Sequence, residues 1–402
     1  MKKKRILILG SYGCGNRGDE AILDSIVLYF RDCDITATCG KDRRIQGDIP
    51  ISYIDCRLAE GKVTFEIFLS FVKSVFKLFC KIMSVDAVIF GGGSSLHDLK
   101  GYNLPFWLGL QLWANLFGKK TYYVGMGVGP ISTGFGKFLC KHFLRHADKV
   151  FVRDQRGFDI CLSLGLRNIA LANDAAFCKP RMTGGKPLDF SDLPTEPYIC
   201  ISACAWGASE NWWRTDSEYQ KQLEDYYRQL IDCCTYFIQQ TGKPAVFVPS
   251  FCHDEKIGRL LEEAIPNSMC TCLPVSLSFQ DMSEIVGNSY LLIGMRMHTM
   301  IFALRRGVPV IAINYDEKVT QLMNMVGLPG YVLDMDEMSK ENLFSLYQLQ
   351  EEHRDEVVRT VTESAMRFAR TTDACLNEIR ESIGLEPCRY FTEKETCAIE
   401  PV

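Results

Sequence analysis

Residues 5–30 read RILILGSYGCGNRGDEAILDSIVLYF and contain the pattern that indicates the fold class. Its first five residues, Arg5 to Leu9, form a short apolar run that ends at Gly10, as a buried parallel strand does. The residues from Glu20 to Phe30 place apolar side chains at helical spacing. A strand, a glycine-rich turn and a helix in this order predict the start of a doubly wound α/β sheet.

Similar apolar runs, each followed by a glycine or a polar turn, recur through the first half of the chain. They lie at 34–38, 87–90, 121–124, 149–152 and 169–172. A polar stretch rich in glycine and proline then interrupts the pattern at 184–197. We interpret this stretch as a linker.

The strand and helix pattern restarts after the linker. The runs of the second half lie at 198–202, 245–248, 290–293 and 308–313, with helical periodicity at 217–240 and 341–383. The sequence therefore predicts an α/β protein with two Rossmann-like domains facing across a cleft. The expected bounds are 1–183 and 198–335, followed by a helical extension and tail at 336–402.

The composition is that of an ordinary globular protein. The 402 residues are 47% apolar and 23% charged, and the formal net charge is −4. This length allows two domains with their own cores. A negative net charge provides no general attraction for nucleic acid, so we expect no nucleic-acid partner.

The 18 cysteines are scattered, most of them singly within apolar runs. No Cys-x-x-Cys pair is present, so the spacing does not indicate zinc, and we expect no bound metal. The apolar run that follows the basic residues 2–5 is too short for a signal peptide. Without export, reduced thiols in the cytoplasm are the simplest interpretation.

Residues 65–83 read FEIFLSFVKSVFKLFCKIM and predict a helix with Lys73, Lys77 and Lys81 along one face. The segment is too charged and too short to span a bilayer. Two interpretations stay open. It is either a core helix with a solvated lysine stripe or an interfacial helix that rests on anionic lipid.

The first motif lies between the first strand and its helix, where residues 13–18 satisfy G-x-G-x-x-G. Such a loop lets backbone N–H groups approach an anion at a helix N-terminus. A helix cap made by Asn16 and Asp19 is the alternative. A dinucleotide would require an acidic residue at the end of the second strand, where Asp42 is poorly placed.

The second motif is the run of glycines from Gly91 to Gly93, directly after the buried run at 87–90. Three successive glycines indicate a tight turn or a ligand that approaches the backbone closely. His97 and Asp98 then lie just beyond the end of the strand. A plain strand-to-helix turn is the alternative.

The third motif places Arg296 and His298 directly after the run at 290–293, where a core would require apolar side chains. If the strand continued, the two side chains would share one face. Arginine offers a planar fork for a carboxylate or phosphate, and histidine exchanges a proton near neutral pH. A core histidine beside a structural arginine is the alternative.

Two further cations follow predicted strands. Lys318 comes after the run at 308–313, and Arg153 follows the run at 149–152. Both are expected at the carboxyl ends of strands, where ligands of such sheets bind. Lys318 also fits a solvated helix position, and Arg153 also fits an ion pair near Asp154.

These residues, together and in this order, resemble the polysaccharide pyruvyl transferase family. The resemblance covers residues 6–335. The matching pieces are Gly13-x-x-Asn16-x-Gly18-Asp19-Glu20-Ala21-Ile22, Gly91-Gly92-Gly93 with Asp98, Gly125-x-Gly127-x-Gly129-Pro130, Arg153-Asp154, Asp174, Arg296-x-His298, and Pro309 leading to Tyr315-Asp316-x-Lys318.

The resemblance implies a GT-B-like architecture. It implies transfer of pyruvate from phosphoenolpyruvate to two hydroxyls of a sugar in a cell-surface polysaccharide or its lipid-linked precursor. The product is a cyclic ketal, and phosphate is released. Phosphoenolpyruvate is then a co-substrate, and no cofactor is expected. The expected location is the cytoplasm, including peripheral contact with the inner face of the membrane.

Phosphoenolpyruvate carries a carboxylate and a phosphate on one small frame, so several cations must converge on it. We assign donor binding to Arg153, Arg296 and Lys318, with the backbone of Gly92 and Gly93.

The ketal chemistry requires acid–base groups. His298 is the candidate general acid or base, and Asp98 is the candidate base for the sugar hydroxyl. Tryptophan rings suit sugar stacking, although interdomain packing is the alternative. The candidates for the cleft and the acceptor are Asn16, Asp19, Trp206 and Trp212.

Two other functions fit the same pattern. A GT-B glycosyltransferase would hold the diphosphate of a nucleotide sugar on the glycine-rich strand ends. A non-catalytic glycan- or nucleotide-binding module would use Arg296 and His298 for recognition only.

Overall fold

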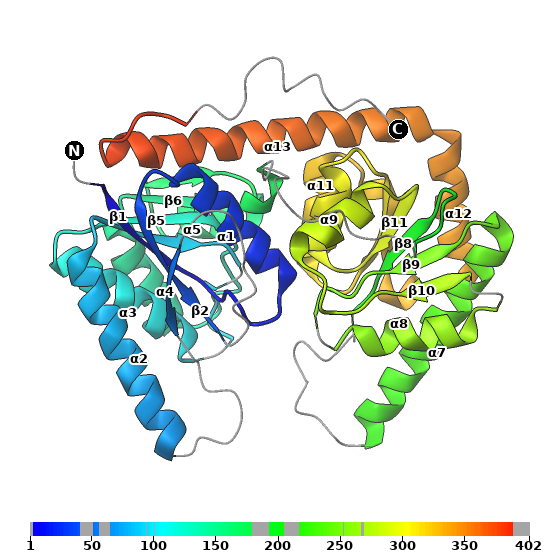
Figure 1. Cartoon of the computed structure of the whole chain (residues 1–402), viewed down its shortest axis with the longest axis horizontal. Coiled ribbons are helices and arrows are strands. Elements are labelled where there is room, and N and C mark those ends of the chain that lie inside the picture. The colour runs from blue at the N-terminus through cyan, green and yellow to red at the C-terminus, as the bar shows by residue number, and fades with distance from the viewer. Residues whose placement is uncertain are drawn as a thin grey trace. The chain divides into compact units, whose positions relative to one another are not determined.

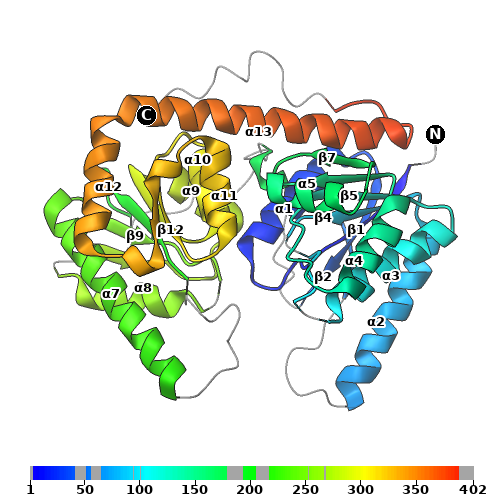
Figure 2. The same ribbon diagram turned by 180° about the vertical axis from the view of Figure 1, so that it is seen from behind.

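A computed structural model describes residues 3–40, 51–55, 65–93, 95–99, 101–178, 193–204, 217–251, 253–266 and 269–388. The chain divides into two compact units, shown from opposite sides in Figures 1 and 2. Unit 1 comprises the described residues within Met1–Arg181 and Arg367–Ala398. Unit 2 comprises those within Met182–Met366. Most of the predicted linker, 184–192, lies outside the described residues.

Unit 1 is built on a seven-stranded parallel sheet with the strand order β3-β2-β1-β4-β5-β6-β7. Its central strands are buried on both faces, which is why they read as continuous apolar runs. The strands are β1 (Arg5–Leu9), β2 (Asp34–Cys39), β3 (Ser52–Asp55), β4 (Ala87–Gly91), β5 (Lys120–Met126), β6 (Lys149–Val152) and β7 (Ile169–Leu171).

Helices cover both faces of this sheet. The core on one face joins apolar side chains of α2, α3, α4 and α5 to those of the strands. On the other face, α1 packs against the short helix η2. The helices are α1 (Arg17–Tyr29), α2 (Phe65–Ser84), α3 (Asn103–Leu116), α4 (Gly134–Phe143), η1 (Leu144–His146), α5 (Gln155–Ser163) and η2 (Ala175–Phe177).

The helix predicted at 65–83 is present as α2. Leu78 and Ile82 are buried in the core of unit 1, whereas Lys73 and Lys77 are exposed. The first interpretation of this segment, a helix that packs on the sheet and exposes lysines, therefore describes its fold. Among the described helices, none has the length and apolar character needed to cross a membrane.

Unit 2 repeats the architecture with a six-stranded parallel sheet in the order β10-β9-β8-β11-β12-β13. Its strands are β8 (Ile199–Ser202), β9 (Ala245–Phe247), β10 (Cys270–Cys272), β11 (Leu291–Gly294), β12 (Val310–Asn314) and β13 (Val332–Asp334). Its helices are α7 (Ser217–Thr241), α8 (Glu255–Ala264), α9 (Phe279–Gly287), α10 (Met297–Leu304), α11 (Glu317–Val326), η3 (Pro329–Tyr331), η4 (Met335–Glu337) and α12 (Lys340–Glu352).

The last helix, α13 (Arg354–Ser382), begins in unit 2 and ends in unit 1. In its first part, Ser364 Oγ donates to the carbonyl of Val326 at 2.8 Å. In its last part, Arg380 forms an ion pair with Asp32 at 2.8 Å. The stretch that we expected to form one extension, 336–402, is therefore divided between the two units.

Two parallel α/β units confirm the predicted fold class. The local structure after β11 differs from the expectation. The strand ends at Gly294, and His298 lies in α10. Arg296 and His298 therefore do not share a strand face. Every cysteine within the described ranges is a free thiol.

Candidate functional site

The most promising site lies in unit 2, where its sheet changes direction. From β8 the chain proceeds to β9 on one side and, later, to β11 on the other. Loops that follow the two central strands diverge at such a point and leave room for a ligand. Arg296 follows β11 at this position.

Arg296 is the N-cap residue of α10. The Arg296 side chain makes no capping hydrogen bond to this helix, whereas the N-cap side chains Asp316 and Ser278 cap α11 and α9. The first N–H groups of a helix lack intrahelical partners and carry partial positive charge. An uncapped N-terminus beside an arginine is suited to bind an anion.

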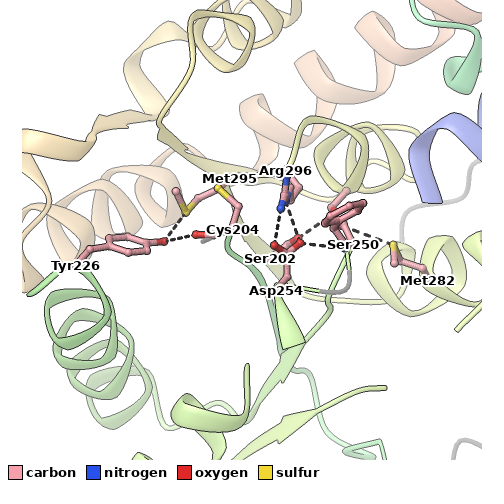
Figure 3. Close-up of polar contacts among 10 residues, drawn as sticks. Ser202, Cys204, Tyr226, Ser250, Asp254, Met282, Met295 and Arg296 are labelled. Atoms are coloured by element: carbon pink, nitrogen blue, oxygen red, sulfur yellow. Dashed lines mark hydrogen bonds and ion pairs between the residues drawn. The ribbon is translucent and has the colours of Figure 1, made fainter. Parts of the chain in front are cut away.

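A buried carboxylate holds the guanidinium of Arg296 in place (Figure 3). Arg296 Nε donates to Asp254 Oδ2 at 2.9 Å, and Nη2 donates to Oδ1. The Asp254 side chain is 0% exposed, while that of Arg296 is 23% exposed. The bidentate pair therefore fixes the plane of the guanidinium. Nη1 takes no part in these two hydrogen bonds, and the side chain that carries it is partly exposed.

The charges of this pair influence each other strongly. Burial raises the pKa of Asp254, although Arg296 and the backbone N–H of Phe251 oppose that shift. Burial would lower the pKa of Arg296, but Asp254 raises it above its ordinary value. Arg296 is therefore a permanent cation at neutral pH.

A second cation lies in the same unit at the turn from β12 into α11. Lys318 Nζ contacts Asp316 Oδ2 at 3.0 Å and lies 5.0 Å from the centre of the Tyr315 ring. Burial raises the pKa of the Cys204 thiol to about 12, although the positive charges of Arg296 and Lys318 oppose this shift. The two cations therefore share one electrostatic environment, and Cys204 is a neutral thiol within it.

Buried polar side chains support the turn that carries Arg296. Ser202 Oγ donates to Thr299 Oγ1 at 3.0 Å, and Ser250 Oγ lies 2.6 Å from the same oxygen. Tyr226 contacts Met295 and the carbonyl of Cys204 (Figure 3). These contacts join the ends of β8, β9 and β11, so the turn has a rigid base.

His298 is the second residue of α10, two positions after Arg296. Its side chain is partly buried. The residue lies beside the uncapped N–H groups, where a proton donor could reach an anion held there. The structure thus brings three predicted residues, Arg296, His298 and Lys318, into unit 2.

The other predicted residues belong to unit 1. Gly92 and Gly93 follow β4 with φ angles of +66° and +73°. A Cβ at Gly92 would lie 2.5 Å from the Ile22 side chain, so this glycine is required for packing. A Cβ at Gly93 would meet no atom closer than 3.6 Å, so only its backbone conformation requires glycine.

Asn16 and Asp19 lie at the start of α1, which follows β1, and β1 and β4 flank the direction change of this sheet. Asn16 Oδ1 accepts from the N–H of Gly18 at 3.1 Å, and its amide donates to Asp19 at 2.9 Å. Asn16 therefore caps α1, as the alternative interpretation expected. Asp19 lies 3.7 Å from the Cβ position of Gly93, which places both at one edge of the sheet.

Arg153 is enclosed by carboxylates. Its guanidinium lies 3.4 Å from Asp154 and 3.6 Å from Asp174, and its side chain is 7% exposed. The backbone of Gly127 packs against the guanidinium, because a Cβ there would lie 2.9 Å from Nη2. One cation between two carboxylates has no excess positive charge for an anion, so these contacts favour a structural role over donor binding.

Asp98 holds a neighbouring loop. Its Oδ2 accepts from the backbone N–H of Thr133 at 2.6 Å and from Oγ1 of the same residue at 2.7 Å, and Oδ1 accepts from Ser132 at 3.2 Å. Desolvation opposes the effect, but these hydrogen bonds lower the pKa of Asp98 to about 2. A carboxylate with this pKa is a weak base, so the contacts favour a positioning role over the predicted base.

A scan against protein-family models matches residues 16–317 to the polysaccharide pyruvyl transferase model. The chain belongs to the polysaccharide pyruvyl transferase family. The match includes both strand-end regions described above, from Asn16 in unit 1 to Arg296 and His298 in unit 2.

A named relative of this pyruvyl transferase family member is amylovoran biosynthesis protein AmsJ from Erwinia amylovora. It is 22% identical over 418 residues, which cover 93% of this chain and 100% of that protein. The family and this relative connect the chain to polysaccharide biosynthesis.

Solved structures similar to this pyruvyl transferase family member share its fold. A putative UDP-N-acetylglucosamine 2-epimerase from Listeria monocytogenes has a TM-score of 0.61 at 13% identity, covering 97% of this chain and 100% of that chain. Anabaena HepE in complex with UDP and glucose has a TM-score of 0.59 at 13% identity, covering 94% and 99%. At this identity the likeness concerns the GT-B-like fold alone.

Two predicted acceptor residues, Trp206 and Trp212, lie outside the described residues. Asp254, the partner of Arg296, was not predicted from the sequence. A signal was present, since Asp254 follows the predicted strand at 245–248 closely. Its pairing with Arg296 depends on the strand order, which places β9 and β11 on either side of β8.

Proposed function

We propose that the protein transfers pyruvate from phosphoenolpyruvate to two hydroxyls of a sugar, forming a cyclic ketal and releasing phosphate. Membership of the polysaccharide pyruvyl transferase family supports this reaction. The single observation that carries the proposal is the turn from β11 into α10. There, the oriented Arg296 fork stands beside an uncapped helix N-terminus.

In this proposal, unit 2 holds the donor. Phosphoenolpyruvate is a small, highly charged anion that requires fixed cations and N–H donors. Arg296 and the first N–H groups of α10 would bind one anionic group, and Lys318 would neutralise the other. Asp254 is the positioning residue that keeps the fork in one plane. Arg153, Gly92 and Gly93 were also predicted from the sequence to bind the donor, and those roles stay predictions.

The reaction requires one proton at the methylene carbon of phosphoenolpyruvate. We propose that protonated His298 donates this proton while the first sugar hydroxyl attacks C2 and loses its own proton to solvent or to a base. Phosphate then leaves as the C2–O bond to it breaks. The second hydroxyl attacks C2, closes the ring and loses its proton. Of the two hydroxyl protons, one restores protonated His298 and the other goes to the released phosphate, so the protons balance. The methylene becomes a methyl group, and the released phosphate is the other product.

The acceptor in this proposal is a sugar of a cell-surface polysaccharide or of its lipid-linked precursor. The relative named for amylovoran biosynthesis supports a polysaccharide acceptor. Because phosphoenolpyruvate is an intermediate of cytoplasmic metabolism, we propose that the enzyme acts in the cytoplasm. A lipid-linked acceptor would bring it to the inner face of the membrane.

Titration calorimetry separates the proposal from its rivals. The purified chain is titrated with phosphoenolpyruvate, with UDP-glucose and with UDP-N-acetylglucosamine. We expect heat from phosphoenolpyruvate and loss of that heat in Arg296→Met. Binding of a nucleotide sugar alone would replace the proposal by a glycosyltransferase or epimerase.

A phosphate-release assay tests catalysis. The enzyme is incubated with phosphoenolpyruvate and a panel of bacterial polysaccharide repeat units, and the products are examined by mass spectrometry. The expected result is acceptor-dependent phosphate release with a product heavier by one pyruvyl group. Binding of phosphoenolpyruvate without turnover on any acceptor would favour a binding module.

A further inference from the structure

One face of unit 1 exposes large apolar side chains in unusual number. Among the described residues, every exposed large apolar side chain except Leu349 belongs to unit 1, and most of them lie on or beside α2, α3 and α4. These three helices cover the same face of the sheet and lie side by side in both views (Figures 1 and 2). Such a concentration marks an interaction surface.

The central helix of this layer, α3, carries no charged residue. It packs against α2 on one side and α4 on the other. Its outward positions are Pro105, Gly109, Leu112 and Leu116, all of them exposed. Leu116 is 68% exposed. A helix that faces water normally carries polar side chains on this stripe, so its outer surface is built for an apolar environment.

The two flanking helices combine aromatic and basic side chains. On α2, Phe76 is 67% exposed and lies between the exposed Lys73 and Lys77. On α4, the exposed Phe135 and Phe138 alternate with Lys137 and Lys141, which are exposed too. Apolar side chains therefore lie at the centre, and cations rim them on both sides.

The charge of this region contrasts with that of the whole chain. The chain has a formal net charge of −4. Between positions 72 and 146, the acidic residues are Asp86 and Asp98 alone, and Asp86 pairs with Arg5 while Asp98 holds Thr133. The Lys and Arg residues of this stretch are Lys73, Lys77, Lys81, Lys100, Lys119, Lys120, Lys137, Lys141 and Arg145.

We propose that this basic apolar face, formed by the outward side chains of α2, α3 and α4, docks on an anionic lipid surface. Apolar side chains at the centre would enter the boundary between headgroups and acyl chains, and the lysines would meet anionic headgroups. A second copy of the chain is a poor occupant, because a symmetric interface would bring the lysines of the two copies together. The surface extends the predicted lipid contact from α2 alone to three helices.

The test is co-sedimentation of the full chain with vesicles of phosphatidylcholine, with and without phosphatidylglycerol. We expect binding only to vesicles with phosphatidylglycerol. It should weaken strongly between about 0.1 M and about 1 M salt, where the Debye length falls from about 10 Å to about 3 Å.

Two variants separate the charged and apolar contributions. Replacement of Lys73, Lys77, Lys137 and Lys141 by Glu should lower vesicle binding by about 10²-fold or more, since each basic residue contributes to the attraction. The double variant Leu112→Gln, Leu116→Gln keeps every charge and should also weaken binding, because it removes apolar insertion. Thermal unfolding by circular dichroism checks that both variants are folded.

A matched control carries the same change in net charge at exposed basic positions outside this face: Lys221, Lys340, Arg359 and Arg370, each replaced by Glu. The control should retain most vesicle binding. Absence of wild-type binding at low salt, or equal loss in the control, overturns the proposal. A wild-type dimer that the double leucine variant converts to a monomer, without vesicle binding, assigns the face to self-association instead. No substrate is present in this assay, so its outcome is independent of the pyruvyl transfer reaction.

Discussion

Two arginines at strand ends show how position and surroundings decide what a cation does. Arg153 follows β6 in unit 1, and Arg296 directly follows β11 in unit 2. Arg153 lies between two carboxylates and is 7% exposed. Arg296 pairs with one carboxylate and is 23% exposed. The two carboxylates beside Arg153 neutralise its charge. Asp254 fixes the orientation of Arg296, whose side chain stays partly exposed.

Both guanidinium groups are paired with carboxylates, so a strand-end arginine can contact a ligand only where its partners leave part of the side chain exposed. Arg296 stands at the direction change of its sheet, beside an uncapped helix. Arg153 stands two strands away from the direction change of the other sheet, against the backbone of Gly127. We therefore propose that Arg153 stabilises unit 1 and that Arg296 binds the donor, and four experiments test this proposal.

The largest effect is expected from Arg153→Met. Removal of this buried cation takes the guanidinium away from the carboxylates of Asp154 and Asp174, which should cost about 3–5 kcal/mol of unfolding free energy. Urea unfolding measures the loss. The control Arg167→Met, at an exposed position, should stay within about 0.5 kcal/mol of wild type. A fully stable Arg153→Met protein with weakened phosphoenolpyruvate binding would return Arg153 to the donor site.

The second effect concerns catalysis in unit 2. His298→Ala should lower turnover by roughly 10²-fold or more and leave donor affinity within several-fold, because it removes the proton donor but no anion ligand. Phosphate release measures turnover, and calorimetry measures affinity. His353→Ala, an exposed histidine in the same unit, is the control. Turnover near the wild-type rate in His298→Ala would remove this residue from the mechanism.

The third experiment compares the two arginines directly. Arg296→Lys should weaken phosphoenolpyruvate binding by about 1.5–3 kcal/mol, because an ammonium cannot pair bidentately with Asp254 and also present an oriented N–H group to the donor. Arg153→Lys, the matched change in unit 1, should leave donor affinity unchanged. Calorimetry on both variants gives the comparison. Equal losses in the two variants would show that both arginines touch the donor.

The fold could be predicted from the sequence because its central strands are buried on both faces and read as short apolar runs before glycine or polar turns. The short strand β3 was not predicted, since Ser52–Asp55 is only four residues long and half polar. The helix α3 was not predicted for a different reason. Its apolar residues lie all round, so it has no amphipathic period to recognise.

The candidate site could be predicted in part. Arg296, His298 and Lys318 stood out because charged residues directly after buried strands require an explanation. Their partners could not be read from spacing, since Asp254 is 42 positions from Arg296 and meets it only through the order of the strands. The same holds for Asp98, whose partner Thr133 is 35 positions away.

The smallest effect is expected from a substitution of Asp98, the residue of unit 1 that was predicted to be the base for the sugar hydroxyl. Hydrogen bonds from Thr133 and Ser132 lower its pKa from 3.8 to about 2. A carboxylate whose pKa is lowered in the folded state stabilises that state above its unfolded pKa and loses this contribution as the pH falls through its folded pKa. Asp98→Asn should therefore be less stable than wild type by about 0.5–1 kcal/mol at neutral pH, a small value because the group is partly exposed to solvent.

This stability difference should be constant above about pH 5, shrink as the pH falls toward the folded pKa of about 2, and be lost below it. Urea unfolding of both proteins across this range measures it, and Ser132→Ala should reproduce part of the loss because it removes one of the hydrogen bonds. Turnover of Asp98→Asn at pH 7 should fall by less than about tenfold if Asp98 only positions the loop at Thr133. A loss of about 10³-fold with unchanged stability would instead make Asp98 the catalytic base. It would then place chemistry in unit 1 as well as at Arg296 in unit 2.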